Sequence, residues 1–470
     1  MASDNDNNFI PYFTAMENQG HVLVRDIPKL DLESYISNYT GRTRFDRLLL
    51  IGQCCIPLCL DALRAAVAEA KKGKDVGRYR DAWHLLKQAL PNGNDADLDN
   101  EWIAAMEAAN AEQTRNLEAQ LKGYKHNLIK ESIRIGNRDL GEHLEATGKL
   151  IEAADAYLKM RSDATLQSHI FDVGRHMISV MLQRRDWPGV LSNTGKLVMA
   201  STMAQEEVAV QQPYQKIATG LGYLGSGKYA EAAKAFLDVG DPANIALYND
   251  TVSPNDVAIY GGLMSLASMD RLELQKRVLD SSSFRNYLEL EPHIRKAISM
   301  FVNGRYTSCL QMLESYRPDY LLDIYLQPHI TAVFTLIRNK CIVQYFLPFS
   351  CVTLSSLNEA FGKPNEGIEP ELVKLIKTGV LQARINTIDK LLVAVSTEPR
   401  IAMQTKALEA AKNYEKETIE RIRRVSIAAA ELEVKGSHKK GNGAIPPLEL
   451  FGDGTRFSDV GLGGTDEDIQ

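Results

Sequence analysis

Glycines and one lysine between residues 220 and 229 have the spacing of a phosphate-binding loop. The segment GYLGSGKY, from Gly222 to Tyr229, fits G-x-x-x-x-G-K, in which backbone N–H groups and the lysine hold phosphates. With Gly220 included, the glycines also fit the G-x-G-x-x-G dinucleotide fingerprint. A phosphate loop follows a buried strand, however, and a Ser or Thr that binds magnesium follows its lysine. Here Tyr229 follows Lys228, and the preceding VQQPYQKIATGL has helical character. We interpret the glycines as residues that end helices (helix punctuation), and the alternative is a nucleotide-binding enzyme.

The other reactive side chains do not form a recognisable catalytic pattern. The nine histidines lack the H-x-H and H-E-x-x-H spacings of zinc hydrolases, and no G-x-S-x-G segment is present. The cysteines include no C-x-x-C pair, so we expect buried thiols rather than a metal or redox site. We therefore predict no catalytic residue, no metal ligand and no cofactor. The six cysteines are Cys54, Cys55, Cys59, Cys309, Cys341 and Cys351.

Length and composition indicate a multidomain globular protein. The chain has 470 residues, 44% of them hydrophobic and 24% charged, and its formal net charge is −6. A nucleic-acid-binding protein normally carries a basic face, which this balance does not suggest. The most apolar run, from Leu48 to Leu60, is too short to cross a bilayer and contains Gln53 and Pro57. We predict an intracellular, soluble protein with no membrane or nucleic-acid partner.

Three glycine turns recur along the chain and reveal repeats. Gly148-Lys149-Leu150 precedes IEAADAYL, Gly227-Lys228-Tyr229 precedes AEAAKAFL, and Gly304-Arg305-Tyr306 precedes TSCLQML. Degenerate copies between them give a period of about 34 to 43 residues, which is typical of helix-turn-helix solenoids. In such a repeat the glycine ends the first helix with a positive φ. Gly148, Gly227 and Gly304 are therefore predicted to be structural turn residues.

The helical period defines the domain organisation. We predict a flexible leader over residues 1–30 and a helical-repeat, TPR-like α-solenoid over residues 31–320. A winged-helix segment follows over residues 321–398, then a long helix over residues 399–435 and a disordered tail over residues 436–470. The protein is thus expected to be mostly α.

The winged-helix prediction rests on the order of elements after Tyr320. Three helices are expected, over His329–Phe349, from a cap at Thr353 or Ser355 to Gly362, and over Glu369–Gly379. VLQARI and KLLVAV flank NTID, which indicates a β-hairpin. Charges on the third helix balance, which favours protein contact over DNA binding. We expect the hairpin edge, with Leu381, Ala383 and Ile385, to contact a partner.

The long helix has an apolar seam with heptad spacing. Gln404, Glu415 and Thr418 interrupt this seam. Folding back onto its own domain is one possibility, and packing in a bundle with helices of other chains is the favoured one. The residues predicted to contact partners are Ile401, Leu408, Ile422, Val425 and Leu432.

A helical solenoid followed by a winged helix resembles the PCI family of proteasome-lid, signalosome and initiation-factor subunits. Within it, NYTGRTRFDRLLLIG, RPDYLLDIYLQPHI, IRNKCIVQYFLPFSCVTLSSLNEAFG and ELVKLIKTGVLQARINTIDKLL closely resemble the subunit 1 family of the COP-nine signalosome. These blocks lie between about residue 38 and residue 392. The loop GKPNEG, from Gly362 to Gly367, departs from that family's pattern. The related lid subunit of the 26S proteasome is the runner-up.

The resemblance implies a non-catalytic scaffold in the complex that removes the ubiquitin-like modifier Nedd from cullin-RING ligases. It implies that the isopeptidase zinc site belongs to another subunit, and that winged helices and terminal helices of the PCI subunits pack together. The implied partners are other PCI and MPN subunits and, through the complex, cullin-RING ligases. A cytoplasmic and nuclear location is expected.

Overall fold

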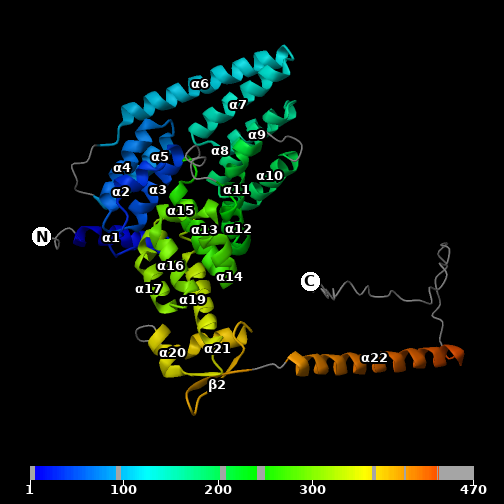
Figure 1. Cartoon of the computed structure of the whole chain (residues 1–470). Helices are drawn as coiled ribbons and strands as arrows, with labels where there is room; N and C mark the ends of the chain where they lie inside the picture. Colours follow the sequence, from blue (N-terminus) through cyan, green and yellow to red (C-terminus); the bar gives the residue numbers. More distant parts are fainter. Residues whose placement is uncertain are drawn as a thin grey trace, which may run out of the picture. The chain divides into compact units, whose positions relative to one another are not determined.

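Helices make up most of the chain in this computed structural model (Figure 1). The structure describes residues 6–90, 97–201, 208–240, 249–362, 367–395, 399–430 and 432. The described residues up to 395 form one compact unit, and the described residues from 399 onward form a second. The predicted GKPNEG loop is described only at its ends, and the predicted tail lies outside the described residues.

Part of the N-terminal segment packs in the first unit, so the structure contradicts the predicted flexible leader at residues 12–24. Tyr12, Phe13 and Met16 on the first helix are buried in one cluster with Leu63 and Leu86. The sequence analysis missed this helix because it begins with Asp6, Asn7 and Asn8 and contains Pro11, which normally disfavours a helix interior. The first helices are α1 (Asp6–Asn18), α2 (Leu32–Ser37), α3 (Gly41–Cys54), α4 (Cys59–Lys72) and α5 (Val76–Ala89).

The next helices form the predicted solenoid, in which each helix contacts the one that follows it (Figure 1). Neighbouring helices bury much of each amphipathic face, as in a repeat array, and Trp187 and Tyr229 also contact Tyr325 and His329 outside it. The helices are α6 (Asn100–His126), α7 (Lys130–Ala146), α8 (Leu150–Ser162), α9 (Gln167–Gln183), α10 (Trp187–Ser201), α11 (Val208–Gly225) and α12 (Tyr229–Leu237).

Helix α13 (Pro254–Ser268) is the centre of the core. It is buried on all sides and contacts α12, α15, α16 and α19. A capping box between Ser253 and Asp256 fixes its start, with Pro254 in the first turn. Around it lie α14 (Arg271–Glu273), the π-helix η3 (Leu274–Leu279), α15 (Ser282–Leu290), α16 (Pro292–Val302), α17 (Tyr306–Ser315), α18 (Arg317–Leu321) and α19 (Ile330–Phe346).

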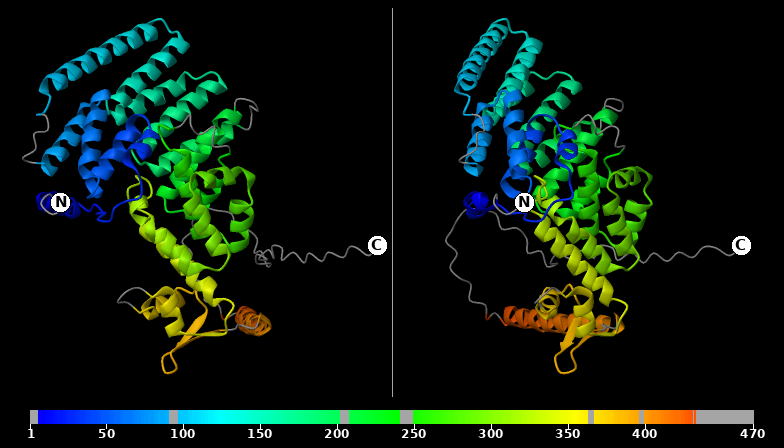
Figure 2. Two further views of the ribbon diagram at one scale, coloured as in Figure 1. Left: turned by 60° about the vertical axis from the view of Figure 1, so that its left-hand side comes forward. Right: turned by 90° about the vertical axis from the view of Figure 1, so that its left-hand side faces the viewer.

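A small winged-helix region follows α19 (Figure 2). Its three-stranded antiparallel sheet has the order β1-β3-β2, and the sequence analysis missed β1 because that strand is only three residues long. Buried residues of this region share one cluster with the solenoid, so no break in the core marks the predicted boundary at residue 320. The elements are β1 (Cys351–Thr353), α20 (Leu354–Phe361), α21 (Glu369–Lys377), β2 (Ala383–Asn386) and β3 (Leu391–Ala394).

The second unit contains the long helix α22 (Pro399–Ala429). The sequence predicted this helix to continue to residue 435, but within the described residues it ends at Ala429. Leu432 lies beyond that end.

Candidate partner-binding surfaces

The glycine-rich segment is a packed helix and turn. Helix α11 precedes the turn, so the strand that a phosphate loop requires is absent from residues 208–225. A Cβ atom at Gly220, Gly222 or Gly225 would lie 2.7 Å from Phe236, 2.9 Å from Leu191 or 2.3 Å from Trp187, respectively. Those three glycines therefore allow close helix packing. Their interpretation as punctuation is wrong, because they lie within α11.

Gly148, Gly227 and Gly304 have φ angles of +88°, +73° and +77°. At each turn the glycine N–H donates to the carbonyl oxygen three residues earlier. The next N–H donates to the carbonyl oxygen five residues before it. This Schellman pattern satisfies carbonyl groups at the end of the first helix of each pair. Arg185, with φ of +57°, and the next residue make the same two bonds at the turn before α10.

The winged-helix sheet leaves one side of β2 without a partner strand in the described chain. Ala383 pairs with Ala394, and Arg384 pairs with Val393. The Val395 N–H donates to the Gln382 carbonyl oxygen at 3.1 Å. Because antiparallel residues alternate in direction, Gln382 and Arg384 face β3, whereas the backbones of Ala383 and Ile385 face outward. Their N–H and C=O groups form an open edge.

The side chains at this edge differ from the prediction. Leu381 and Ala383 are buried at 4% and 5% exposure, and Ile385 is half-buried. The Leu381 N–H also donates to the Leu375 carbonyl oxygen, so Leu381 offers neither a side chain nor a donor to a partner. Ile388, which the sequence analysis did not select, is 91% exposed in the β2–β3 turn. A partner at this edge would contact backbone groups and Ile388.

Helix α22 exposes many large apolar side chains. The apolar face is wider than predicted, since Met403, Tyr414, Ile419 and Ile427 are also exposed. Ile419 lies three residues before Ile422, which places both on the same helical face. The predicted residues are exposed at 57% (Ile401), 63% (Leu408), 60% (Ile422), 68% (Val425) and 72% (Leu432). Leu432 is exposed but does not continue the helical seam.

Known proteins resemble almost the whole chain. A family model described as "PCI domain" matches residues 313–395, and one described as "26S proteasome subunit RPN7" matches residues 99–277. The COP9 signalosome complex subunit 1 of Neurospora crassa is 46% identical over 450 residues, which are 96% of this chain and 99% of that protein. The chain belongs to the COP9 signalosome subunit 1 family.

Other comparisons agree with this family. The subunit 1 proteins of Emericella nidulans and Arabidopsis thaliana are 47% and 35% identical, over 88% and 87% of this chain and 85% and 92% of theirs. The 26S proteasome non-ATPase regulatory subunit 6 of rice is 23% identical, over 69% of this chain and 81% of that protein. The prediction that favoured the signalosome family over the proteasome-lid family is therefore confirmed.

Two sequence blocks that carried the signalosome resemblance meet at a buried ion-pair cluster. Arg47 on α3 is fully buried and donates to Asp256 at 2.8 Å and to Asp323 at 2.7 Å. The Tyr39 hydroxyl donates to Asp256, and the Tyr260 hydroxyl donates to Asp323, each at 2.7 Å. The Arg47 cluster therefore joins α3, α13 and the segment after α18.

Burial and neighbouring charges shift the pKa values of two groups in the Arg47 cluster. Burial raises the pKa of Asp256 to about 6, although the nearby Arg47 guanidinium acts in the opposite direction. Burial raises the pKa of the Tyr39 hydroxyl well above its usual value. The Tyr39 ring lies 4.0 Å from the Arg47 guanidinium carbon, which adds a cation–π contact. Sequence reasoning missed these residues because their partners lie more than 200 positions apart.

The described residues contain no group of three or more His, Cys, Asp or Glu side chains placed to hold a metal ion. Nor is any helix among them long and apolar enough to span a membrane. Of the six cysteines, five are buried, and Cys351 is exposed.

Proposed function

We propose that this protein is a non-catalytic scaffold subunit of a COP9 signalosome. The observation that carries this proposal is the 46% identity with a protein named signalosome subunit 1, over nearly the full length of both chains. In this role the chain supports removal of Nedd from cullin-RING ligases, and another subunit supplies the isopeptidase site. Its partners are other PCI and MPN subunits, with cullin-RING ligases reached through the complex.

Two surfaces suit this role. The outward backbone groups of Ala383 and Ile385 can pair with a strand of a neighbouring winged helix, which gains main-chain hydrogen bonds. The apolar residues of α22 can pack in a bundle of helices from several subunits. Burying each such side chain contributes about 1.5–3 kcal/mol before ordering costs. Together these surfaces would bind two different parts of the complex.

Affinity purification of the tagged protein at its natural expression level tests membership of the complex. We expect signalosome subunits in stoichiometric amounts and Nedd-cleaving activity in the purified assembly. The isolated chain should not cleave a cullin–Nedd conjugate or hydrolyse ATP. Recovery of 26S proteasome lid subunits in place of signalosome subunits would instead support the proteasome-lid alternative.

Proline substitutions test the β2 edge. Ile385→Pro removes an outward-facing N–H, so the isolated chain should lose less than about 1 kcal/mol of unfolding free energy while complex assembly weakens at least tenfold. The matched variant Arg384→Pro removes an N–H that faces β3 and should destabilise the winged helix itself. Normal assembly with Ile385→Pro, measured by co-purification, would show that no partner strand pairs here.

We also propose that the protein works in both the cytoplasm and the nucleus. Imaging of the tagged endogenous protein tests this location. Exclusion from either compartment would contradict the proposal.

A further inference from the structure

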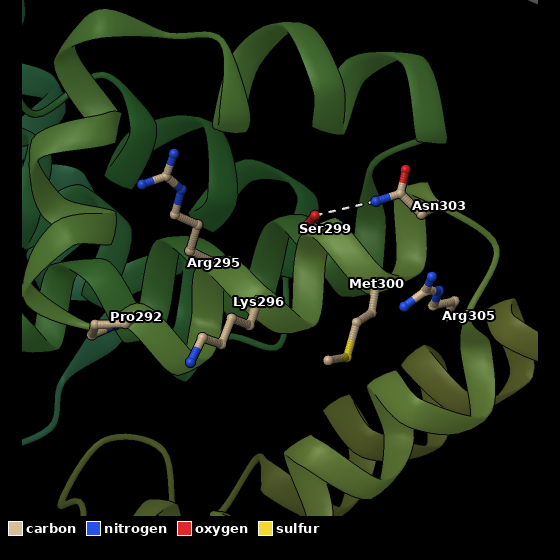
Figure 3. A pocket seen from close by; sticks show the side chains of 7 residues that line it. All are labelled: Pro292, Arg295, Lys296, Ser299, Met300, Asn303 and Arg305. Carbon is tan, nitrogen blue, oxygen red and sulfur yellow. Dashed lines mark hydrogen bonds between the residues drawn. The ribbon is translucent and has the colours of Figure 1, made fainter.

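A groove with unpaired positive charges runs along α16 (Figure 3). Its volume is about 550 Å³, and its lining includes Arg295, Lys296 and Arg305 but no acidic residue. These three side chains are exposed, and none forms an ion pair within the described chain. The nearby Glu291 already accepts a hydrogen bond from Asn255 at 2.7 Å. The groove therefore has a local positive charge on a chain whose net charge is −6.

Further cationic groups reinforce this charge at the end of α16. The Arg271 side chain is exposed, and its Nε donates to the Val302 carbonyl oxygen at 2.6 Å. Arg305 is the N-cap residue of α17, and its side chain makes no capping bond. The free N–H groups of the first turn of α17 add partial positive charge beside it. Carboxylates placed here would meet charge from side chains and from backbone.

The groove also has an apolar part. Pro292 and Met300 line it, and Figure 3 shows Met300 between the Lys296 and Arg305 side chains. Ser299 accepts a hydrogen bond from Asn303 at 3.3 Å on the same helix. A methionine thioether adapts to differently shaped apolar groups. This combination favours a ligand that carries an apolar residue between acidic ones.

The length of the groove favours a peptide over a small anion. Its lining on α16 runs from Pro292 to Asn303, and a rise of ~1.5 Å per residue makes this about 16 Å. An extended peptide covers that length with about five residues at ~3.3 Å each. We propose that the α16 groove binds an acidic peptide segment of a partner protein, with carboxylates on Arg295, Lys296 and Arg305 and one apolar side chain on Met300. This proposal is independent of the β2 edge and of α22.

Fluorescence anisotropy with the full chain tests the proposal. The probe is a labelled peptide Gly-Asp-Glu-Leu-Asp-Glu-Gly, and its counterpart has Asn and Gln in place of Asp and Glu. We expect the acidic probe to bind at least tenfold more tightly than the neutral one and to weaken as salt rises. Equal binding of the two probes would overturn the proposal.

Charge-reversal variants locate the binding. The triple variant Arg295→Glu, Lys296→Glu and Arg305→Glu should bind the acidic probe at least tenfold more weakly. A control variant with the same change of charge, Lys122→Glu, Lys159→Glu and Arg161→Glu, alters exposed residues of α6 and α8 and should bind within twofold of wild type. Similar losses in both variants would indicate only a general charge effect and overturn the proposal.

A substitution in the apolar part separates a peptide from a phosphate ligand. Met300→Ala should weaken the Leu-containing probe several-fold but leave a probe with Gly in place of Leu unchanged. Inorganic tripolyphosphate should compete poorly. If it binds more tightly than the probe, and if Met300→Ala has no effect, the groove is an anion site and the peptide proposal is wrong. Thermal melting of each variant checks folding, and Arg295→Gln with Arg305→Gln provides a milder second test.

Discussion

The first unit and helix α22 differ in how far their large apolar side chains are exposed. Helix α13 in the first unit buries Val257, Tyr260 and Leu263 completely. Helix α22 exposes Leu408 and Val425 by more than half. Apolar surface of this extent is unusual on a monomer and generally marks an interaction site. This contrast supports the proposal that α22 packs against a partner, whereas the first unit buries its core within its own chain.

Removal of α22 should strongly reduce assembly of the complex while leaving the stability of the first unit nearly unchanged, which is the largest effect expected here. Truncation after Arg400 should reduce incorporation into the complex at least ~100-fold, since a net loss of about 3 kcal/mol suffices for that change. The melting temperature of the remaining chain should change little. Co-purification and calorimetry measure the two effects. A matched variant keeps the helix but carries Ile401→Ala, Leu408→Ala, Ile422→Ala and Val425→Ala, and it should assemble as poorly as the truncation.

Two results would contradict this contrast. Full incorporation of the truncated chain would show that α22 contributes nothing to assembly. Unfolding of the truncated chain would show that α22 packs on its own domain, which was the alternative that the sequence left open.

Loss of the Arg47 charge should produce the largest effect within the first unit. Arg47→Met leaves Asp256 and Asp323 buried without their cation, and breaking a buried pair in this way costs about 3–5 kcal/mol. Urea unfolding measures the loss. The matched variant Arg421→Met, on an exposed part of α22, should change stability by less than about 0.5 kcal/mol. Equal stability of the two variants would show that the Arg47 cluster does not hold these segments together.

The pH dependence of stability tests the same cluster. The pKa of Asp256 is raised to about 6 in the folded state, so folding favours its protonated form. Its contribution to stability is therefore largest below about pH 4 and is lost as the pH rises to about 6. The stability advantage of wild type over Asp256→Asn should thus decrease by roughly 1–3 kcal/mol between pH 4 and pH 7. Unfolding at several pH values measures this, with Asp155→Asn, an exposed residue on α8, as the control. If the stability advantage of wild type grew with pH, the raised pKa of Asp256 in the folded state would be contradicted.

The smallest effects concern the glycine turn. Gly227→Val forces a branched residue into φ of +73° and should cost about 1–2 kcal/mol. The neighbouring Lys228→Ala should change stability by less than about 0.5 kcal/mol and leave the activity of the assembled complex intact. A tenfold loss of activity with Lys228→Ala, without unfolding, would support the nucleotide-binding alternative.

The sequence alone predicted the structural elements that depend on patterns within a few residues of each other. Repeating Gly148, Gly227 and Gly304 indicated the solenoid, and the apolar period of residues 399–435 indicated a long helix, which the structure has over Pro399–Ala429. Thr353 was one of two predicted caps for α20, and its side chain does accept the Ser356 N–H. Each of these features depends on backbone conformation or helical period within a few residues, so each leaves a pattern that can be recognised in one chain.

The tertiary structure alone decided which side chains meet. Leu381 looked like an interface residue, but packing against the rest of the core buries it. Tyr12 looked like part of a loose leader, yet its hydroxyl donates to the Gly52 carbonyl oxygen at 3.2 Å. Arg47 forms ion pairs with Asp256 and Asp323, which lie 209 and 276 residues further along the chain. Such contacts depend on how the whole chain folds. A local stretch of sequence cannot predict them, because the energy of a contact depends on the distance between the two side chains and not on their separation along the chain.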